Sequence, residues 1–290
     1  MSRVRPLLLV LGVAALLAGG CSSGPYEPKP WQGLPAATPP GVTTPPAPTP
    51  APQPSLVPTT PPGPTTPPPT TKPTPTKTPP KKPSKPRYST AGTQRTTGGS
   101  GVALTFDDGP DPVLTPQLLD LLRKYRVKAT FCLVGKRATE FPHLVRRIVA
   151  EGHTLCNHSW NHEFPLASWP VEQIRANLQN TNAAIRKAVP NAKIAYFRAP
   201  GGNFNSRVIA IAKSMGMHSI YWTVDTRDWD AETFGHGAPM VRHIIYSVQH
   251  STYPGGIVLS HDLGKPDTIA AYRTLLPWLK ARYKLIPLAT

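Results

Sequence analysis

The chain has 290 residues and a formal net charge of +17, and 25 of its 39 prolines lie between residues 25 and 86. This leaves about 190 residues of ordinary globular composition, enough for one domain with a sizeable core. The positive charge is spread along the chain instead of concentrating on one segment with interleaved aromatic residues, which argues against a nucleic-acid-binding protein.

The first 21 residues have the pattern of an export signal. Two arginines precede an apolar stretch at 7–18, which is too short for an ordinary transmembrane helix. The small residues that follow end at Cys21, and this junction resembles a bacterial lipoprotein lipobox, in which the cysteine is acylated. The resemblance implies a lipid anchor at Cys21 that holds the chain on the outer face of the cell membrane. Ordinary secretion after cleavage is the alternative.

Residues 22–99 form a segment rich in proline, threonine and lysine, with few aliphatic side chains. A segment of this composition cannot bury enough apolar surface to fold, and its prolines favour an extended polyproline II conformation. We therefore expect a disordered linker that carries a domain at 100–290 from the membrane into the cell wall. The basic charge of the exported chain favours contact with anionic envelope polymers.

After residue 100, short β-rich segments alternate with helical patterns. Strands are expected at 102–106, 128–134, 153–157, 194–197, 218–224, 256–260 and 284–288. Helices are expected at 116–125, 138–150, 171–189, 205–215, 239–249 and 266–281. This alternation predicts an α/β fold with a parallel sheet that is closed, or nearly closed, into a barrel.

Five of the seven expected strands end in ionisable side chains. The first ends at Asp107 and Asp108, two adjacent like charges that need a cation or another partner nearby. The later strand ends supply, in chain order, His158 and His162, then Arg198, then Asp225, Asp228 and Trp229, and finally His261. Because the carboxyl ends of parallel strands meet at one end of a barrel, we expect these side chains to share one site.

His158 and His162 are four residues apart, a spacing that on one helical turn lets both imidazoles reach the same cation. One carboxylate of the aspartate pair would complete a set of two histidines and one carboxylate, as in catalytic zinc sites with open positions. The other aspartate, held beside the ion, could then act as a base. The structural alternatives are that the aspartates only form a turn before Gly-Pro and that Asp228 caps a helix.

Five short motifs occur in the order TFDDG at 105–109, HSWNH at 158–162, RAPG at 198–201, DTRDW at 225–229 and LSH at 259–261. Together they resemble the motifs of polysaccharide deacetylases of carbohydrate esterase family 4, the NodB homology domain. The resemblance covers about residues 100–290. It implies a distorted, incomplete (β/α) barrel of about seven strands and metal-dependent removal of N- or O-acetyl groups from sugars.

The resemblance also implies a role for each residue at the metal. Asp108, His158 and His162 would hold Zn²⁺, or another divalent transition metal such as Co²⁺ or Ni²⁺. Asp107 would accept a proton from the attacking water. Arg198 would orient Asp107, and its fixed positive charge would keep that carboxylate ionised.

On the other side of the reacting group, the resemblance makes His261 the acid that protonates the departing amine or alkoxide, with Asp228 hydrogen-bonded behind it. The backbone N–H of Gly201 would contact the oxyanion. Trp229 and Leu259 would line the slot for the acetyl methyl group. Because position 201 is glycine and not a bulkier residue, the cleft is expected to be more open there.

Cys132 and Cys156 remain as an even pair in a chain that is expected to leave the cytoplasm. Disulfides persist in the oxidising environment outside the cytoplasm. Each cysteine lies in an expected strand, so a disulfide is geometrically possible, and two buried free thiols are the alternative.

These features together predict a monomeric, lipid-anchored deacetylase of cell-wall polysaccharide that acts on N-acetylglucosamine of peptidoglycan. Within the same class of enzyme, a chitin-oligosaccharide deacetylase or an acetylxylan esterase is the alternative. A non-catalytic wall-binding module is the alternative of a different class, and it would require the loss of a base, an acid or a metal ligand. None of these residues is missing from the sequence.

Overall fold

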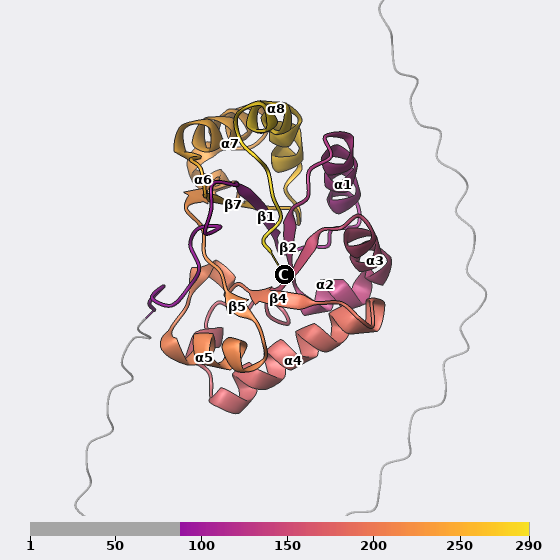
Figure 1. The fold of residues 1–290 in the computed structure, drawn as a ribbon, viewed down its shortest axis with the longest axis vertical. Helices are drawn as coiled ribbons and strands as arrows, with labels where there is room; N and C mark the ends of the chain where they lie inside the picture. The colour runs from indigo at the N-terminus through magenta and orange to yellow at the C-terminus, as the bar shows by residue number, and fades with distance from the viewer. Residues whose placement is uncertain (1–87, 290) are drawn as a thin grey trace, which may run out of the picture. The chain divides into compact units, whose positions relative to one another are not determined.

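A computed structural model describes residues 88–289 of the chain. The expected signal peptide, the expected lipidation site Cys21 and residues 22–87 of the expected linker lie outside the described part. Within it, seven strands form one sheet in the order β5-β4-β3-β2-β1-β7-β6, and every neighbouring pair is parallel. Helices lie outside the strands (Figure 1). The predicted incomplete (β/α) barrel of about seven parallel strands is confirmed.

The strands of the barrel are short, and the five inner ones are buried along their whole length. They are β1 (Ala103–Asp107), β2 (Thr130–Leu133), β3 (Thr154–Asn157), β4 (Ile194–Phe197) and β7 (Ile257–His261), with β5 (His218–Ser219) and β6 (Val224–Asp225) at the two edges. Burial on both faces explains why these segments are largely apolar, without a strict alternation of polar and apolar residues.

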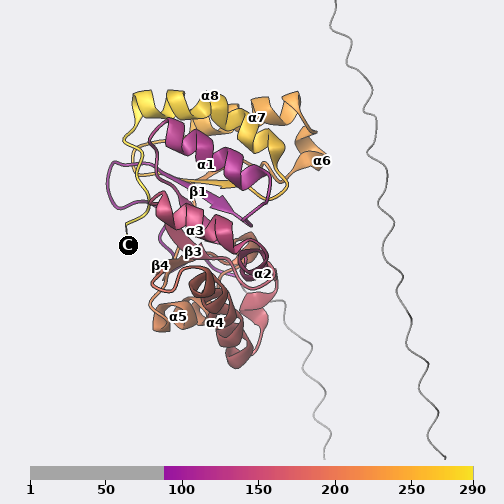
Figure 2. The same cartoon turned by 90° about the vertical axis from the view of Figure 1, so that its right-hand side faces the viewer.

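The helices pack an apolar stripe against the outside of the barrel. They are α1 (Leu114–Lys124), α2 (Gly135–Glu140), α3 (Pro142–Ala150), α4 (Val171–Ala188), α5 (Ser206–Ser214), α6 (Ala231–Phe234), α7 (Ala238–Ser251) and α8 (Pro266–Arg282). In α1, for example, the buried Leu118, Leu119 and Leu122 recur at helical spacing. Figure 2 shows α7 and α8 on one side of the strands and α4 and α5 on the other. Among residues 88–289, no helix has the length and apolarity needed to cross a membrane.

One expected helix, at 138–150, is two helices in the structure, α2 and α3. Pro142 explains the break, because it lacks an N–H and disfavours helical geometry at the preceding residue. Phe141 accordingly has φ −126° and ψ 57°, and Pro142 begins α3. The earlier start of α2, at Gly135, brings the residues just after β2 into a helix.

The expected strand at 218–224 is also divided, since its two ends are β5 and β6 at opposite edges of the sheet. Residues 220–223 cross from one edge to the other. The chain before residue 100 supports this crossing, because Gln94 forms a β-bridge with Ile220 and Thr96 forms one with Gly256.

The linker was expected to reach residue 99, whereas the chain already hydrogen-bonds to the barrel at Ser89, whose N–H donates to Phe204 O.

The expected strand at 284–288 is not a strand. Only one bridge, between Val102 and Leu285, joins it to the sheet, and Pro287 has no N–H with which to continue a ladder. The segment instead runs across the barrel, where the Leu288 N–H donates to Thr130 Oγ1 at 3.2 Å and the Leu288 side chain is buried. Figure 1 accordingly shows the chain end near the centre of the ring of strands.

The barrel interior contains a disulfide between Cys132 of β2 and Cys156 of β3. The two residues are register partners in the β2–β3 ladder, and they pack in one buried cluster with Ala103, Ile257 and Leu288. The two cysteines are therefore not free thiols in this structure. Their bridge ties together two neighbouring strands of the barrel.

Candidate active site

A cleft of about 550 Å³ opens at the carboxyl ends of the strands. Most of the side chains that the sequence singled out line it, namely Asp107, Asp108, His158, His162, Gly201, Asp225, Trp229, Leu259 and His261. Arg198 and Asp228 are buried and do not line the cleft. The structure therefore brings all five motifs to one place, as parallel strands of a barrel require.

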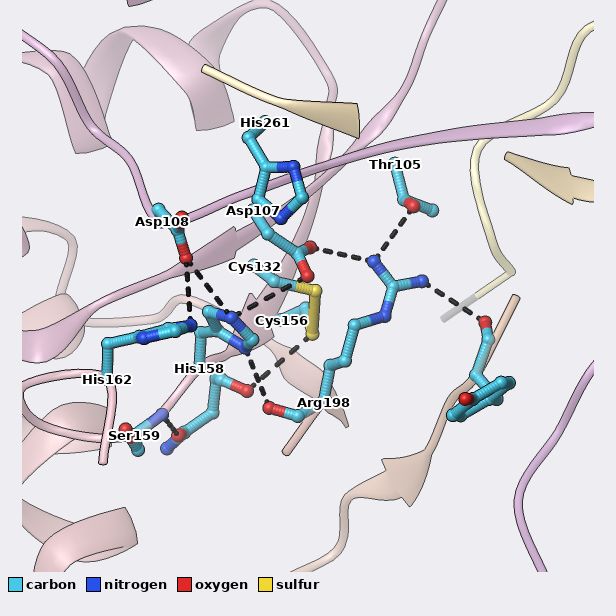
Figure 3. A network of polar contacts seen from close by, with 12 residues as sticks. Thr105, Asp107, Asp108, Cys132, Cys156, His158, Ser159, His162, Arg198 and His261 are labelled. Atoms are coloured by element: carbon cyan, nitrogen blue, oxygen red, sulfur yellow. Dashed lines mark hydrogen bonds and ion pairs between the residues drawn. A yellow bond between two sulfur atoms is a disulfide. The ribbon is translucent and has the colours of Figure 1, made fainter. Parts of the chain in front are cut away.

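Asp107 and Asp108 point to different partners although they are adjacent. Asp107 ends the buried strand β1 and accepts a hydrogen bond from Arg198 Nη1 at 2.7 Å. Asp108 has a left-handed backbone, with φ 79°, and its carboxylate faces the two histidines (Figure 3). The like charges are thus divided between a guanidinium on one side and imidazoles on the other.

His158 is fixed in orientation by the backbone of the neighbouring strand. It follows β3, and its Nδ1 lies 2.8 Å from the carbonyl oxygen of Arg198, to which an Nδ1–H donates. This tautomer leaves the Nε2 lone pair free, and Nε2 lies 3.3 Å from Asp108 Oδ1. His162 Nε2 lies 3.4 Å from the same oxygen. Figure 3 shows both imidazoles directed at this carboxylate.

The spacing of these histidines was expected to act through a helical turn, and that expectation is wrong. Residues 158–162 form an irregular turn in which Ser159 has φ 67° and His162 has φ 56°. The turn is held by the Ser159 N–H, which donates to Asn157 Oδ1 at 2.9 Å, and by its hydroxyl, which donates to Glu163 Oε2 at 2.7 Å. The imidazoles still converge, with ring centroids 5.1 Å apart.

Asp108, His158 and His162 together fit a metal ion. Each offers one ligand atom, and these atoms all lie within 4.8 Å of one another. Asp108 Oδ1 is buried, and no hydrogen-bond partner for it exists among residues 88–289. A buried carboxylate oxygen without a partner is costly, whereas a divalent cation would satisfy it. The donor set of two imidazoles and one carboxylate suits a transition metal such as zinc.

The charges around these ligands shift their protonation. Burial opposes ionisation of Asp108, but His158, His261 and His162 outweigh it and hold its pKa well below the usual range. Burial and the neighbouring His158 lower the pKa of His162, which favours the neutral form that a metal needs. Burial also disfavours protonation of His158, but Asp107 and Asp108 outweigh this effect and raise its pKa. The carboxylates of Asp107 and Asp108 both lie beside these imidazoles, so a cation at this position is electrostatically favoured.

Arg198 follows β4 and is completely buried beside Asp107. Its Nη1 donates to Asp107 Oδ1 at 2.7 Å and to Thr105 Oγ1 at 2.9 Å, and its Nη2 donates to Tyr221 O at 3.2 Å. Sequence reasoning gave Thr105 no role of its own. The signal was its position two residues before Asp107, since alternate strand residues face the same side.

His261 and Asp228 form a buried pair at the end of β7. His261 ends β7 beside Asp107 of β1 in the sheet register, and its Nδ1 lies 2.6 Å from Asp228 Oδ1. Asp228 Oδ2 accepts from the His261 N–H at 2.8 Å and from Thr268 Oγ1 at 2.6 Å. Burial opposes protonation of His261, but Asp228 outweighs it and raises the pKa of His261 to about 10. The sequence offered no signal for Thr268, which lies on α8.

The wall around Gly201 differs from the expectation of a more open cleft. Gly201 has φ 62°, and its N–H donates to no other group of residues 88–289. A Cβ at this position would lie 2.9 Å from the ring of Phe164, so Phe164 fills the space beside the glycine. Trp229 is half exposed and Leu259 is buried, and both line the cleft.

Three more residues at the site were given no role by the sequence analysis. Trp222 lines the cleft from within an expected strand and stacks on Tyr221, with ring centroids 3.9 Å apart. Lys265 also lines it. Asp262 is buried, which raises its pKa to about 7, and it accepts a hydrogen bond from Thr115 Oγ1.

Residues 94–220 match the model of the polysaccharide deacetylase family. A chitooligosaccharide deacetylase from Sinorhizobium fredii is 37% identical over 198 residues, which cover 64% of this chain and 88% of that protein. This chain belongs to the polysaccharide deacetylase family. A second member of the family, a peptidoglycan-N-acetylglucosamine deacetylase from Bacillus cereus, is 38% identical over 183 residues, or 62% of this chain and 81% of that protein.

A solved structure of the family agrees with this assignment. The crystal structure of the Bc1960 peptidoglycan N-acetylglucosamine deacetylase superposes with a TM-score of 0.61 at 30% identity, over 68% of this chain and 89% of that one. This polysaccharide deacetylase is therefore a hydrolase of carbohydrate esterase family 4. Its relatives are divided between two substrates at similar identity, so the match fixes the family and leaves the polymer to be argued from the site.

Proposed function

We propose that this protein removes N-acetyl groups from N-acetylglucosamine residues of cell-wall peptidoglycan in a metal-dependent hydrolysis. The observation that carries the proposal is the convergence of a metal-ligand set, an Arg198-bound carboxylate and a carboxylate-bound imidazole on one cleft. These are the three elements that hydrolysis of an unreactive amide requires, namely an electrophile, a base and an acid.

Asp108, His158 and His162 are the residues that would hold the metal. A divalent ion bound there would polarise the acetyl carbonyl and lower the pKa of a coordinated water molecule. Zinc suits the donor set best, and cobalt or nickel would satisfy the same ligands.

Asp107 would act as the base toward the attacking water. Arg198 Nη1 donates a hydrogen bond to Asp107 Oδ1 at 2.7 Å, which leaves Oδ2 as the proton acceptor. This second oxygen faces His158, and the distance from Oδ2 to His158 Nε2 is 3.6 Å. The free N–H of Gly201 lines the same cleft and would donate to the carbonyl oxygen as negative charge develops on it.

His261 would donate a proton to the departing amine. The carboxylate of Asp228 binds Nδ1 and leaves Nε2 as the donor toward the cleft. The raised pKa of His261 keeps the imidazole protonated at neutral pH, which is the state that an acid needs before the C–N bond breaks. Trp229 and Leu259 would enclose the acetyl methyl group.

Peptidoglycan is preferred to chitin oligomers and acetylxylan because of the expected export signal and wall-spanning linker. They would hold the enzyme within the cell wall of the organism that makes it, where N-acetylglucosamine is the abundant acetylated sugar. Relatives named for peptidoglycan and for chitooligosaccharides both support a glucosamine N-acetyl group as the target. The alternative substrates within the class are tested by the same assay.

The decisive experiment measures acetate release from peptidoglycan, chitin oligomers and acetylxylan, with and without a chelator. We expect release from the first polymer, loss of release after chelation and recovery when Zn²⁺ is added back. Asp107→Asn should lower kcat by about 10²- to 10⁴-fold, because it removes the base. Asp120→Asn, the same change on the exposed face of α1, serves as the matched control.

Two results would contradict the proposal. Full activity after complete metal removal would exclude the metal-dependent reaction, and full activity of Asp107→Asn would exclude Asp107 as the base. The alternative of a non-catalytic wall-binding module predicts binding to peptidoglycan without acetate release under every condition. The presence of base, acid and ligand set in one cleft favours the enzyme.

We also propose that acylation of Cys21 anchors the enzyme to the outer face of the cell membrane. The observation behind this is the small-residue junction that precedes Cys21 in the sequence. Metabolic labelling with a fatty acid should mark the wild-type chain and leave Cys21→Ala unlabelled. Labelling of neither chain, with release into the medium, would instead indicate ordinary secretion.

A further inference from the structure

The cleft contains a lysine that the proposed reaction does not use. Lys265 lies four residues after His261, between β7 and α8, and lines the cleft. It is half-buried. Among the described residues that line this cleft, it is the one lysine or arginine; the other charged groups there are histidines and the carboxylates of Asp107, Asp108 and Asp225.

Lys265 has no carboxylate partner within residues 88–289, and nearby acidic side chains are engaged elsewhere. Asp267 Oδ2 accepts from the Gly237 N–H at 2.9 Å, and Asp111 Oδ2 accepts from the Gly264 N–H at 3.1 Å. Asp225 Oδ1 accepts from the Arg227 N–H at 2.8 Å. The ammonium group is therefore available to a ligand in the cleft.

The position of Lys265 is unfavourable for the fold itself. It is the N-cap of α8, a helix of 17 residues, and makes no side-chain capping hydrogen bond. A cation is disfavoured at a helix N-terminus, where the helix dipole is positive. A lysine at a helix N-terminus that makes no stabilising contact within the fold indicates that its charge serves the function of the protein. An anion in the cleft would meet both the ammonium group and the positive end of the dipole.

We propose that Lys265 binds a carboxylate carried by the sugar next to the N-acetylglucosamine that is deacetylated, and thereby selects an acidic glycan over a neutral one. This inference rests on the proposed function. The remaining cleft walls, such as the half-exposed Trp229, serve any glucosamine polymer. A neutral chitin oligomer leaves Lys265 unpaired, whereas peptidoglycan presents carboxylates on its stem peptides, or on the lactyl ether of the adjacent sugar where the peptide has been removed.

The test compares the full chain and its Lys265→Gln variant on three substrates. These are a neutral chitin oligomer, intact peptidoglycan fragments, and glycan strands from which an amidase has removed the peptides to free the lactyl carboxylate. The readout is the ratio of kcat/KM for each acidic substrate to kcat/KM for the neutral one. We expect Lys265→Gln to lower this ratio about two- to fivefold, through KM, because one partly exposed ion pair is lost.

Two further variants keep the test independent of folding. Lys265→Arg retains the charge and should keep most of the ratio, while Lys213→Gln removes an exposed lysine of α5 outside the cleft and should leave the ratio at its wild-type value. The loss in Lys265→Gln should also shrink as salt is added, since salt screens the ion pair. A general folding defect would instead lower kcat/KM on all three substrates together and leave the ratio unchanged.

The outcomes separate this inference from the proposed function. A lower ratio on stripped strands assigns the lactyl carboxylate, and a lower ratio on intact fragments alone assigns the stem peptide. A wild type that deacetylates the polymers, with the same ratio in Lys265→Gln, overturns the role of Lys265 and leaves the proposed function intact. A wild type that releases no acetate from any of the three overturns the proposed function, and this inference with it.

Discussion

Two ionisable groups at the ends of neighbouring strands have buried partners of opposite charge. Asp107 faces the guanidinium group of Arg198, and His261 faces the carboxylate of Asp228. Each group thus meets a buried partner of opposite charge, and the carboxylate of Asp228 stabilises the imidazolium form of His261. A histidine that stays protonated near pH 7 can act as an acid in the same site in which a carboxylate acts as a base.

The Asp228→Asn variant should expose this dependence in the pH profile. Without the carboxylate, burial dominates and the pKa of His261 falls from about 10 toward or below the ordinary histidine value. His261 is protonated only below its pKa, so the alkaline limb of kcat/KM should move to lower pH. At pH 8, kcat should fall about 10²-fold, because little of the acid remains protonated.

Thr268→Val is the matched control for that change. It removes one hydrogen bond to Asp228 Oδ2 but keeps the charge beside His261, so the alkaline limb should move much less. An alkaline limb that stays in place in Asp228→Asn would mean that His261 is not the proton donor.

Local pattern was enough to predict most of the strands and helices, and with them the end of the barrel where the site lies. Contacts between distant segments decide the features that were missed. Residues 220–223 leave the sheet because Tyr221 and Trp222 stack on each other and the chain at Gln94 pairs beside them. The turn of His158 and His162 depends on left-handed residues that are not glycine, which the spacing alone could not reveal.

The link between β2 and β3 offers a test at the level of these strands. Replacing Cys132 and Cys156 together by alanine removes the buried disulfide, whose cysteines are 24 residues apart. We expect the free energy of unfolding to fall by about 2–4 kcal/mol, mainly because the unfolded chain gains freedom. Denaturant unfolding of the purified protein would measure it.

Reduced wild-type protein is the control for that experiment, because it loses the same bond but keeps both sulfur atoms in the barrel. Its midpoint should lie near that of the double variant. If the double variant and the oxidised wild type unfold at the same denaturant concentration, the bridge does not stabilise the barrel.

Both ends of the described chain help to complete the barrel. The C-terminal segment covers its interior through Leu288, and the segment at 89–97 lies along the residues that cross between β5 and β6. The second contact reaches the site indirectly. Arg95 lies over the ring of Tyr221 at 4.7 Å, and the carbonyl of Tyr221 accepts a hydrogen bond from Arg198. The end of the expected linker is therefore part of the folded domain.

A chain that begins at residue 100 should accordingly be less stable than one that begins at residue 88. The shorter chain lacks both backbone hydrogen bonds of Gln94: its N–H donates to Ser219 O and its carbonyl accepts from the Tyr221 N–H, each at 2.8 Å. It also lacks the hydrogen bond from the Thr97 N–H to Gly255 O at 2.9 Å. We expect Tm to fall by about 5–10 °C, as a loss of a few kcal/mol does in a domain of this size. Thermal unfolding of the two chains would measure the difference.

The same truncation should lower kcat, because Tyr221 then loses the contacts that hold its carbonyl against Arg198. Arg95→Ala in the longer chain separates the two effects, since it removes the stacking on Tyr221 and keeps the backbone hydrogen bonds. We expect a small loss of Tm and a smaller loss of kcat in that variant than in the truncated chain. Equal Tm and equal kcat for chains that begin at 88 and at 100 would show that this segment only connects the domain to its linker.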